Sequence, residues 1–244
     1  MHTKNLIDTI YYLKHDLKFL NKINRNQVNK FVSKKDNFLD PVTKLDLKIE
    51  KIIRARINKQ FKNHSIIGEE FSDQIGDTKH IWIIDPIDGT TNFLHGIPHF
   101  AICIALQAKK EIISGLIFDP IKDEMFFAEK NKGAYLNNHR LRVSKKNSIE
   151  DCLFSSNHEG VKFSNLNMRY SGCAALDLAY VASGRLDGFF HNKINLWDVA
   201  AGKLIVEEAG GIVNNINEYN INDIDIRAAS NVIYEEMLLN LKKF

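Results

Sequence analysis

One acidic stretch of the chain reads Asp85-Pro86-Ile87-Asp88-Gly89-Thr90-Thr91-Asn92-Phe93. It follows the apolar run His80–Asp85, which is typical of a buried strand that ends at Pro86. The proline bends the chain, so that Asp88 returns beside Asp85. Two carboxylates this close repel, and the pKa of one of them rises unless a cation neutralises the site. The stretch predicts either a site for Mg²⁺, which prefers oxygen ligands, or a β-turn followed by a helix N-cap.

The residues after this acidic pair, Gly89-Thr90-Thr91-Asn92, are small and polar. They predict the opening of a short helix, where free backbone N–H groups can bind a phosphate. A metal site and a phosphate seat would then be neighbours in the sequence.

Two other stretches add carboxylates to this picture. Gly68-Glu69-Glu70 precedes the strand, and Trp197-Asp198-Val199-Ala200-Ala201-Gly202 begins a helical pattern. Taken singly, Glu69-Glu70 is most simply a solvated pair, Asp198 an N-cap and Trp197 a packing anchor. Taken together with Asp85 and Asp88, they favour one acidic metal site.

The rest of the chain predicts a mixed α/β organisation. A helix from about Thr43 to Phe61 has an apolar stripe and Asp46 in its first turn. The stripe consists of Leu45, Ile49, Ile52, Ile53 and Ile57. The other predicted elements are a helix over 5–20, a loop over 33–40, antiparallel strands over 101–107, 112–118 and 124–129, and helices over 174–183, 198–209 and 231–241.

Composition narrows the class of protein. The 244 residues are 44% hydrophobic and 26% charged, which excludes a disordered chain and a coiled-coil rod. Three cysteines are too few for a disulfide framework or a zinc cage. No apolar run reaches the roughly 18 residues of a membrane helix, and charges interrupt the N-terminus, so we expect a cytoplasmic protein without membrane contact.

The charge is unevenly distributed. Residues 1–62 carry +9 and residues 63–244 carry −6, for a net charge of +3. The basic part is interpreted first as the solvated face of amphipathic helices. The less favoured interpretation is contact with nucleic acid or an acidic protein partner.

The motifs resemble the inositol monophosphatase family of Mg-dependent, lithium-sensitive phosphatases. They occur in the family's order over roughly residues 34–235. The matching stretches are Asp40–Asp46, Gly68–Glu70, Asp85–Asn92, Gly172–Phe190, Trp197–Gly202 and Glu207–Gly211. The resemblance implies a layered αβαβα sandwich of the inositol monophosphatase and fructose-1,6-bisphosphatase type. It also implies a single domain over 1–244, with an N-terminal α+β part to about 140 and a C-terminal α/β part from about 141.

The resemblance also assigns roles to individual residues. Two or three Mg²⁺ ions would be held by Glu69, Asp85, the carbonyl of Ile87, Asp88 and Asp198, with Asp46 reaching the third through water. Glu69 and Thr90, the latter paired with Asp46, would orient and deprotonate the attacking water. Substrate contacts would come from Asp88, Gly89, Thr90, Ala174 and His191.

The activity implied is hydrolysis of a small phosphate monoester by metal-activated water, in a homodimeric enzyme. Inositol 1-monophosphate or a related sugar or polyol phosphate is the first expectation for the substrate. A 3′(2′),5′-bisphosphate nucleotide, fructose 1,6-bisphosphate and histidinol phosphate are alternatives on the same fold. A haloacid-dehalogenase-type phosphatase is less favoured, because two residues separate Asp85 from Asp88 where that type has one. An RNA- or protein-binding role for the basic N-terminal region is the alternative outside catalysis.

Two departures from the family bear on the substrate. His191 occupies a position where inositol-type members have a glutamate. An imidazole there predicts a substrate with an extra anionic group. The alternative is that His191 is a surface residue that does not contact the substrate. The segment between Ser155 and Gly172 is too short for the family's helix, which predicts a more open pocket. Cys103 and Cys173 are predicted to be buried, inert thiols.

Overall fold

A computed structural model of the chain describes residue 15 and residues 44–156, 166–216 and 221–241. The predicted helix over 5–20, the loop over 33–40 and the shortened segment at 157–165 lie outside these residues. Within them, no helix has both the length and the apolar character that crossing a bilayer requires.

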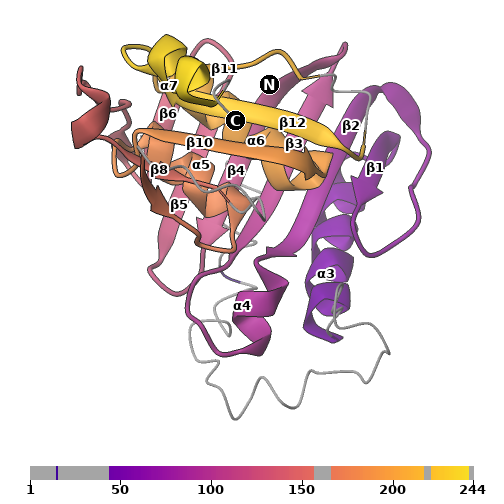
Figure 1. The fold of residues 1–244 in the computed structure, drawn as a ribbon. Coiled ribbons are helices and arrows are strands. Elements are labelled where there is room, and N and C mark those ends of the chain that lie inside the picture. The colour runs from indigo at the N-terminus through magenta and orange to yellow at the C-terminus, as the bar shows by residue number, and fades with distance from the viewer. Residues whose placement is uncertain (1–14, 16–43, 157–165, 217–220, 242–244) are drawn as a thin grey trace.

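The larger sheet of the described residues has seven strands in sequence order (Figure 1). Its first two strands are parallel and all later neighbours are antiparallel, which confirms the predicted meander. The strands are β1 His64–Gly68, β2 Asp77–Asp88, β3 Ala101–Ala108, β4 Glu111–Asp119, β5 Glu124–Glu129, β6 Gly133–Leu136 and β7 His139–Arg140.

The smaller sheet has five strands in the order β11-β12-β10-β8-β9 among the residues described. Its central strand β10 is antiparallel to β12 and parallel to β8. The strands are β8 Leu153–Ser155, β9 Asn167–Arg169, β10 Gly188–Ile194, β11 Gly211–Val213 and β12 Ile224–Ser230, and a 3₁₀ turn, Ile149–Asp151, precedes β8.

The helices complete five layers. Helix α3 (Lys44–Gln60) packs on the outer face of the larger sheet, and α7 (Tyr234–Leu241) packs on β12 of the smaller one. Helices α5 (Ala174–Ala182) and α6 (Leu196–Glu208) contact both sheets and lie between them (Figure 1). The order is therefore α, β, α, β, α, as the resemblance implied.

Helix α3 forms where the apolar periodicity predicted it, within a residue or two at each end. Leu45, Ile49, Ile53 and Ile57 face the sheet and are at most 1% exposed, whereas Ile52 is half-buried at the margin of the stripe. Burying side chains of this size stabilises the fold by roughly 1.5–3 kcal/mol each. That apolar contact holds α3, and with it Asp46, against β1 and β2.

Strand β2 does not end at Pro86, so the predicted boundary is wrong. The strand continues to Asp88, and its pairing with β3 shifts register between Asp85, opposite Cys103, and Asp88, opposite Ala101. Between these two pairs the chain advances by three residues on β2 but by only two on β3, so β2 contains a β-bulge. Proline is tolerated at such a bulge because no regular ladder hydrogen bond needs its missing N–H. In a regular strand, residues three apart point to opposite faces, so the bulge brings the two carboxylates to the same side.

Candidate active site

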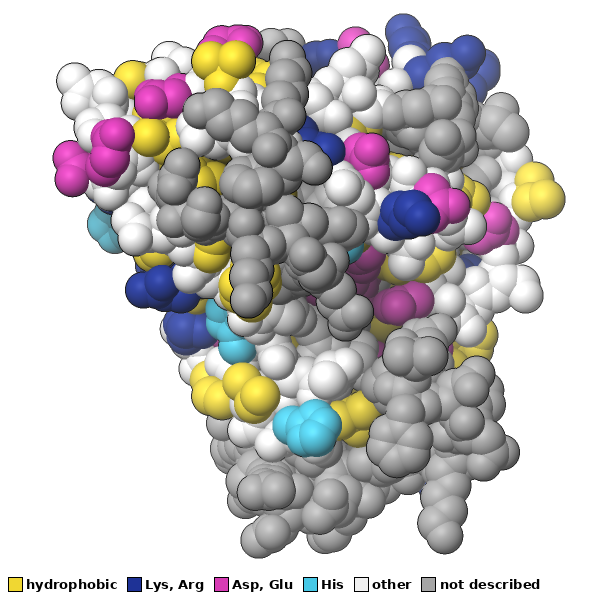
Figure 2. Space-filling view, viewed as in Figure 1, with side chains coloured by type: hydrophobic (Ala, Val, Ile, Leu, Met, Phe, Trp, Pro, Cys, Tyr) yellow, Lys and Arg dark blue, Asp and Glu magenta, His cyan; other side chains and the backbone are white. Residues whose placement is uncertain are grey.

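Three aspartates converge at the end of β2. Asp85 and Asp88 come from the bulged end of that strand and Asp198 from the first turn of α6. Each offers a carboxylate oxygen, and these oxygens all lie within 4.8 Å of one another. Figure 2 shows acidic side chains set back in a hollow near the centre of one face of the molecule. The structure therefore brings together the aspartates that the sequence analysis grouped.

Glu69 joins this cluster from the end of β1. Its backbone N–H donates to the carbonyl of Ile84 at 3.3 Å, so the residue stays beside β2. Burial raises the pKa of Glu69 to about 9, with further contributions from the charges of Asp198, Glu70 and Asp46. The interpretation of Glu69 as one of a solvated pair is therefore wrong.

Asp198 is positioned by the start of α6. The N-cap of this helix is Asn195, and the backbone N–H of Asn195 donates to Oδ2 of Asp198 at 3.1 Å. Asp198 is therefore the third helical residue and not the N-cap, which corrects the simplest interpretation of that residue. An acidic residue at this position returns its carboxylate to the N-cap N–H, and the Asn195-x-x-Asp198 spacing was the sequence signal for it.

The aspartates have raised pKa values because they are withdrawn from water. Burial raises the pKa of Asp85 well above its ordinary value, and the charges of Glu69, Asp198 and Asp88 add to the effect. Burial raises the pKa of Asp198 to about 7, with the charge of Asp88 as the next cause. It also raises the pKa of Asp88 to about 6, although the N–H of Ala175 lowers it in part.

The carboxylate of Asp85 is the clearest sign of what the cluster binds. Both of its oxygens are buried, and among the described residues no donor meets either one with hydrogen-bond geometry. Buried polar atoms in native proteins nearly always have a partner. A divalent cation would supply one here and would offset the crowded charge, so the three converging aspartates fit a hard metal ion.

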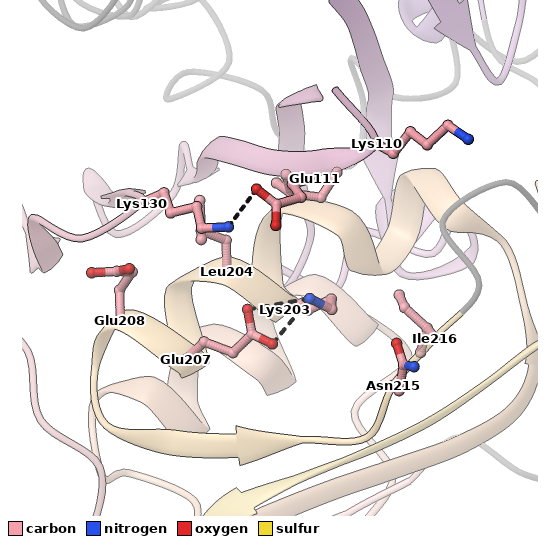
Figure 3. A pocket seen from close by; sticks show the side chains of 10 residues that line it. Lys110, Glu111, Lys130, Lys203, Leu204, Glu207, Glu208, Asn215 and Ile216 are labelled. Atoms are coloured by element: carbon pink, nitrogen blue, oxygen red, sulfur yellow. Dashed lines mark hydrogen bonds and ion pairs between the residues drawn. The ribbon is translucent and has the colours of Figure 1, made fainter. Parts of the chain in front are cut away.

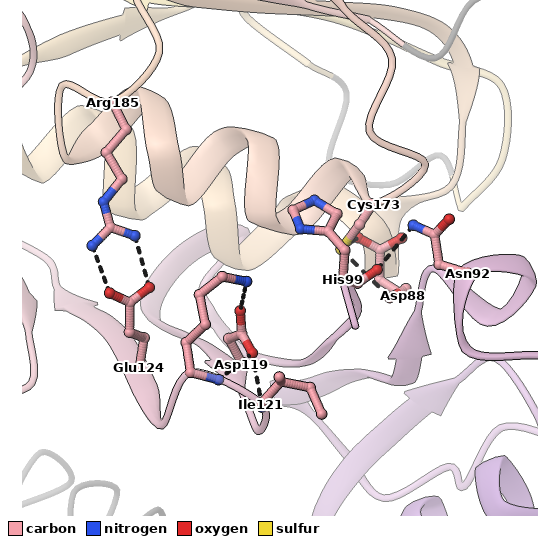
Figure 4. A network of polar contacts seen from close by, with 9 residues as sticks. Asp88, Asn92, His99, Asp119, Ile121, Glu124, Cys173 and Arg185 are labelled. Atoms are coloured by element: carbon pink, nitrogen blue, oxygen red, sulfur yellow. Dashed lines mark hydrogen bonds and ion pairs between the residues drawn. The ribbon is translucent and has the colours of Figure 1, made fainter. Parts of the chain in front are cut away.

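Asp88 is held from α5 (Figure 4). Its Oδ2 accepts the backbone N–H of Ala175 at 2.6 Å and lies 3.2 Å from the thiol of Cys173. Cys103 and Cys173 are both buried, as predicted, but Cys173 contacts the site. No local pattern could have indicated this contact, because it joins residues 85 apart in the sequence.

The predicted short helix after the aspartates is α4, Thr90–Leu94. Gly89 precedes it with φ 90°, where a side chain would be strained, and a Cβ there would lie 3.1 Å from the carbonyl of His99. The side chain of Asn92 donates to the carbonyls of His99 and Ser171, at 2.9 Å and 2.8 Å. The loop beside Asp88 is therefore fixed to the segment that enters α5.

The comparisons with known proteins agree with this arrangement. The profile of the inositol monophosphatase family matches residues 13–242. The chain belongs to the inositol monophosphatase family. Inositol-1-monophosphatase of Rhizobium meliloti is 43% identical over 188 residues, covering 70% of this chain and 71% of that protein. Nus factor SuhB of Pseudomonas aeruginosa is 42% identical over 196 residues, covering 72% of each chain.

A crystal structure extends the agreement to the fold. Extragenic suppressor protein suhB from Bartonella henselae matches with a TM-score of 0.88 at 36% identity, covering 98% of both chains. The protein is accordingly a phosphomonoester hydrolase of a metal-dependent family. Family membership also excludes the haloacid-dehalogenase-type alternative.

The hydrogen bond of the Thr90 side chain differs from the pairing with Asp46 that the family resemblance implied. Its hydroxyl donates to the carbonyl of Ile87 at 2.8 Å, as the first residue of a helix can with the residue three before it. A hydroxyl has a single proton, so in this arrangement it does not also donate to Asp46. Asp46 itself is fully buried in α3, and its charge contributes to the raised pKa of Glu69.

The two remaining predicted substrate residues lie on separate elements. Ala174 is the first residue of α5 and is 4% exposed. His191 is half-buried in β10, and its Nδ1 lies 2.6 Å from the carbonyl of Asn192. Their roles toward substrate stay predictions.

Another group of side chains, His64, Asp77 and His80, also has potential ligand atoms within 4.8 Å of one another. The two imidazole rings are stacked at 4.5 Å with an interplanar angle of 10°. Ring nitrogens bind metals in the plane of the ring, so stacked rings aim along parallel planes and do not converge on one ion. In addition, Nδ1 of His64 accepts the indole N–H of Trp82 at 3.1 Å. This group does not fit a metal.

A pocket of about 620 Å³ lies away from the acidic cluster, at the C-terminal end of α6 (Figure 3). Four of the charged side chains that line it form two ion pairs: Lys130 with Glu111 at 2.6 Å and Lys203 with Glu207 at 3.0 Å. Asp198 and Glu207 are roughly 13 Å apart along the helix at 1.5 Å per residue. The pocket is therefore not the catalytic site.

Proposed function

We propose that this chain hydrolyses inositol 1-monophosphate or a related sugar or polyol phosphate, using Mg²⁺. The observation that carries the proposal is the convergence of Asp85, Asp88 and Asp198. Among the described residues, the carboxylate of Asp85 in this cluster is buried and has no hydrogen-bond donor. The name of the Rhizobium relative supports the choice of substrate class.

The ligand set follows the family resemblance. Glu69, Asp85 and the carbonyl of Ile87 would hold one Mg²⁺, and Asp85, Asp88 and Asp198 a second. A third would touch Glu69 and reach Asp46 through water. The Ile87 carbonyl has a second lone pair beside the one that the Thr90 hydroxyl engages, so both interactions are compatible. Bound Mg²⁺ supplies the positive charge that offsets the carboxylates and the phosphoryl group.

The protein's own groups would then act on water and phosphate. Glu69, whose pKa is raised to about 9 in the absence of metal, is the proposed acceptor of the proton from the attacking water. Thr90 would orient that water, and the backbone N–H groups of Gly89 and Thr90 would hold the phosphate. Asp88, Ala174 and His191 would contact the leaving group. No covalent phosphoenzyme is needed.

The experiment is phosphate release from a panel of monoesters by the purified chain, with Mg²⁺ and with a chelator. The panel contains inositol 1-monophosphate, fructose 1,6-bisphosphate, histidinol phosphate and a 3′,5′-bisphosphate nucleotide. We expect Mg²⁺-dependent release, fastest from inositol 1-monophosphate. Equal release in chelator would contradict the metal assignment, and a different best substrate would correct the substrate class.

An RNA- or protein-binding role is the second candidate. The net charge of +9 over residues 1–62 favours it, and the Pseudomonas relative is named a Nus factor, not a phosphatase. Fluorescence anisotropy with a labelled RNA over a range of salt concentrations tests the RNA part. Salt-sensitive binding without any phosphatase activity would favour this candidate.

We propose further that the chain is one domain over residues 1–244 and forms a homodimer in the cytoplasm. The support for the dimer is the family resemblance, and the support for one domain is that α5 and α6 contact both sheets. Sedimentation velocity on the purified chain measures the mass, and a monomer at micromolar concentration would contradict the dimer.

A further inference from the structure

Helix α3 contains a buried charge that contacts the loop next to the acidic cluster. Glu50, one turn after Asp46, is fully buried. Its Oε2 accepts the backbone N–H of Glu70 at 2.9 Å, and its Oε1 accepts the Nε–H of Arg54 at 2.7 Å. We propose that Glu50 is a positioning residue for Glu69. The inference rests on the proposed function, in which Glu69 is a metal ligand and proton acceptor.

The charge of Glu50 is neutralised locally. The guanidinium group of Arg54 bonds the carboxylate and also donates to the carbonyl of Phe71 at 3.1 Å. The same group lies over the ring of Phe71, with 5.7 Å between the guanidinium carbon and the ring centroid. Glu50 and Arg54 together therefore contact the backbone at Glu70 and at Phe71.

Gly68 makes this approach sterically feasible. A Cβ at position 68 would lie 2.1 Å from Oε1 of Glu50 and 2.9 Å from a guanidinium nitrogen of Arg54. Any other residue would displace the carboxylate. The absence of a side chain just before Glu69 is thus a requirement of the contact with α3.

Glu69 is fixed from two sides. Its own N–H bonds the carbonyl of Ile84 on β2 at 3.3 Å, and the N–H of Glu70 bonds Glu50 on α3. The strand β1 ends at Gly68, so the ladder itself no longer holds the chain beyond that residue. These two bonds hold the backbone on either side of the Glu69 side chain, which lies near Asp85 and Asp198.

The ion pair with Arg54 alone is weak evidence that Glu50 serves only to stabilise the fold. Replacing a buried ion pair by apolar residues of similar size is often neutral for stability. The carboxylate of Glu50 has a second oxygen, however, and this oxygen accepts the backbone N–H of Glu70. Glu70 directly follows Glu69, the proposed metal ligand. Residues that orient metal ligands typically contribute about 10- to 100-fold to metal affinity.

The test compares Glu50 variants for Mg²⁺ binding to the chelator-treated full chain, measured by isothermal titration calorimetry. Glu50→Ala and Glu50→Met remove the acceptor, whereas Glu50→Gln keeps an oxygen for the N–H of Glu70. We expect Mg²⁺ binding to weaken by about tenfold in Glu50→Ala and Glu50→Met and by less than about threefold in Glu50→Gln. Turnover measured in parallel should show a raised half-saturating Mg²⁺ concentration, with a smaller change in the maximal rate.

Asp187 provides the matched control. It is also a buried carboxylate, and its Oδ2 accepts a lysine, Lys146 at 2.9 Å, and a backbone N–H, that of Leu153 at 2.7 Å. It immediately precedes β10, a strand of the other sheet. Asp187→Ala should lower the melting temperature but leave Mg²⁺ affinity unchanged.

Three results would overturn the inference. They are wild-type Mg²⁺ affinity in a folded Glu50→Ala or Glu50→Met, a tenfold loss in folded Glu50→Gln, and equal losses of affinity in the Glu50 and Asp187 variants. Glu69→Gln separates this failure from failure of the proposed function. If wild type binds Mg²⁺ and Glu69→Gln does not, the function stands whatever the Glu50 variants show. If wild type binds no Mg²⁺, both proposals fail.

Discussion

At the scale of single residues, Asp85 is unusual in being a fully buried carboxylate without a donor, whereas Asp88 has two. The two residues occupy one bulged strand end but differ in how much of their charge the protein itself compensates. Under the proposed function, Asp85 would therefore depend most on the bound cation, whereas Asp88 is held in place by α5 without one.

The variant Asp88→Asn should lose turnover but keep its fold. The amide oxygen can still accept the N–H of Ala175, but the negative charge is gone. We expect the rate of phosphate release to fall by on the order of 10²-fold or more, with an unchanged circular dichroism spectrum. Wild-type turnover in this variant would contradict the assignment of Asp88 as a metal ligand.

Cys173 offers a second test at this scale. Serine can donate to Oδ2 of Asp88 as the thiol does, and alanine cannot. We expect Cys173→Ala to raise the half-saturating Mg²⁺ concentration several-fold and Cys173→Ser to stay close to wild type. A thiol is a weak donor, so the expected loss is that of an ordinary hydrogen bond, about 0.5–1.5 kcal/mol, which corresponds to about 2- to 13-fold. Equal behaviour of the two variants would show that the thiol acts only through packing.

His191 tests the choice of substrate. If an imidazole here accommodates an extra anionic group, His191→Glu should shift the ranking of the monoester panel toward inositol 1-monophosphate. The ratio of kcat/KM values for inositol 1-monophosphate and the bisphosphate nucleotide measures this shift. An unchanged ratio would show that His191 does not contact the substrate.

Asp85 and Asp88 could be paired from the sequence because they are three residues apart at the end of a predicted strand, and the family resemblance assigned Asp198 to the same site. The contacts that hold them could not. Cys173 reaches Asp88 only once α5 has packed beside α4, and Glu50 reaches Glu70 only because Gly68 lacks a side chain. Such contacts depend on tertiary packing, which neither periodicity nor residue type encodes.

At the scale of elements, α6 connects the acidic cluster to both sheets. It lies between the two sheets and carries Asp198 in its first turn. Its close packing on the larger sheet depends on Gly115 of β4, where a Cβ would lie 2.7 Å from the carbonyl oxygen of Ala201.

The variant Gly115→Ala should therefore destabilise the protein. The added methyl group forces α6 away from β4, and overpacking of this kind typically lowers the free energy of unfolding by about 1–3 kcal/mol. Urea denaturation measures the free energy of unfolding, and we expect a lower midpoint with an unchanged m-value. A wild-type midpoint would show that α6 can shift without loss of stability. The Mg²⁺ affinity of the variant would then report whether Asp198 moves with the helix.

The elements were largely predictable, and their exceptions have physical causes. The stripe Leu45–Ile57 has a helical period and α3 follows it, and the three meander strands lie within a residue of their predicted bounds. The end of β2 was not predictable, because proline normally terminates a ladder and only the bulge opposite Cys103 and Ala101 accommodates it.

At the scale of the whole molecule, the raised pKa values predict how stability depends on pH. The pKa values of about 9 for Glu69, 7 for Asp198 and 6 for Asp88 all exceed those of the unfolded chain. Between about pH 4 and pH 9, the folded state of the metal-free protein therefore binds more protons than the unfolded state. Its stability is greatest at low pH within this range and falls as pH rises.

Thermal unfolding in chelator should show a melting temperature that decreases from pH 5.5 to pH 8.5. Added Mg²⁺ should raise the melting temperature, and more so at the higher pH, because the metal binds the deprotonated carboxylates. Asp85→Asn should flatten the pH dependence in chelator. A melting temperature that increases over this range would contradict the clustering of charge.

The distance in sequence between Glu69 and Asp198 has a consequence for synthesis of the protein. A growing chain acquires Glu69, Asp85 and Asp88 early, yet it cannot complete the acidic cluster until α6 has emerged and packed between the sheets. Under the proposed function, metal binding would therefore be a late step in the synthesis of each molecule. It would require both halves of the chain to be packed together, so an incomplete chain would bind the ion weakly.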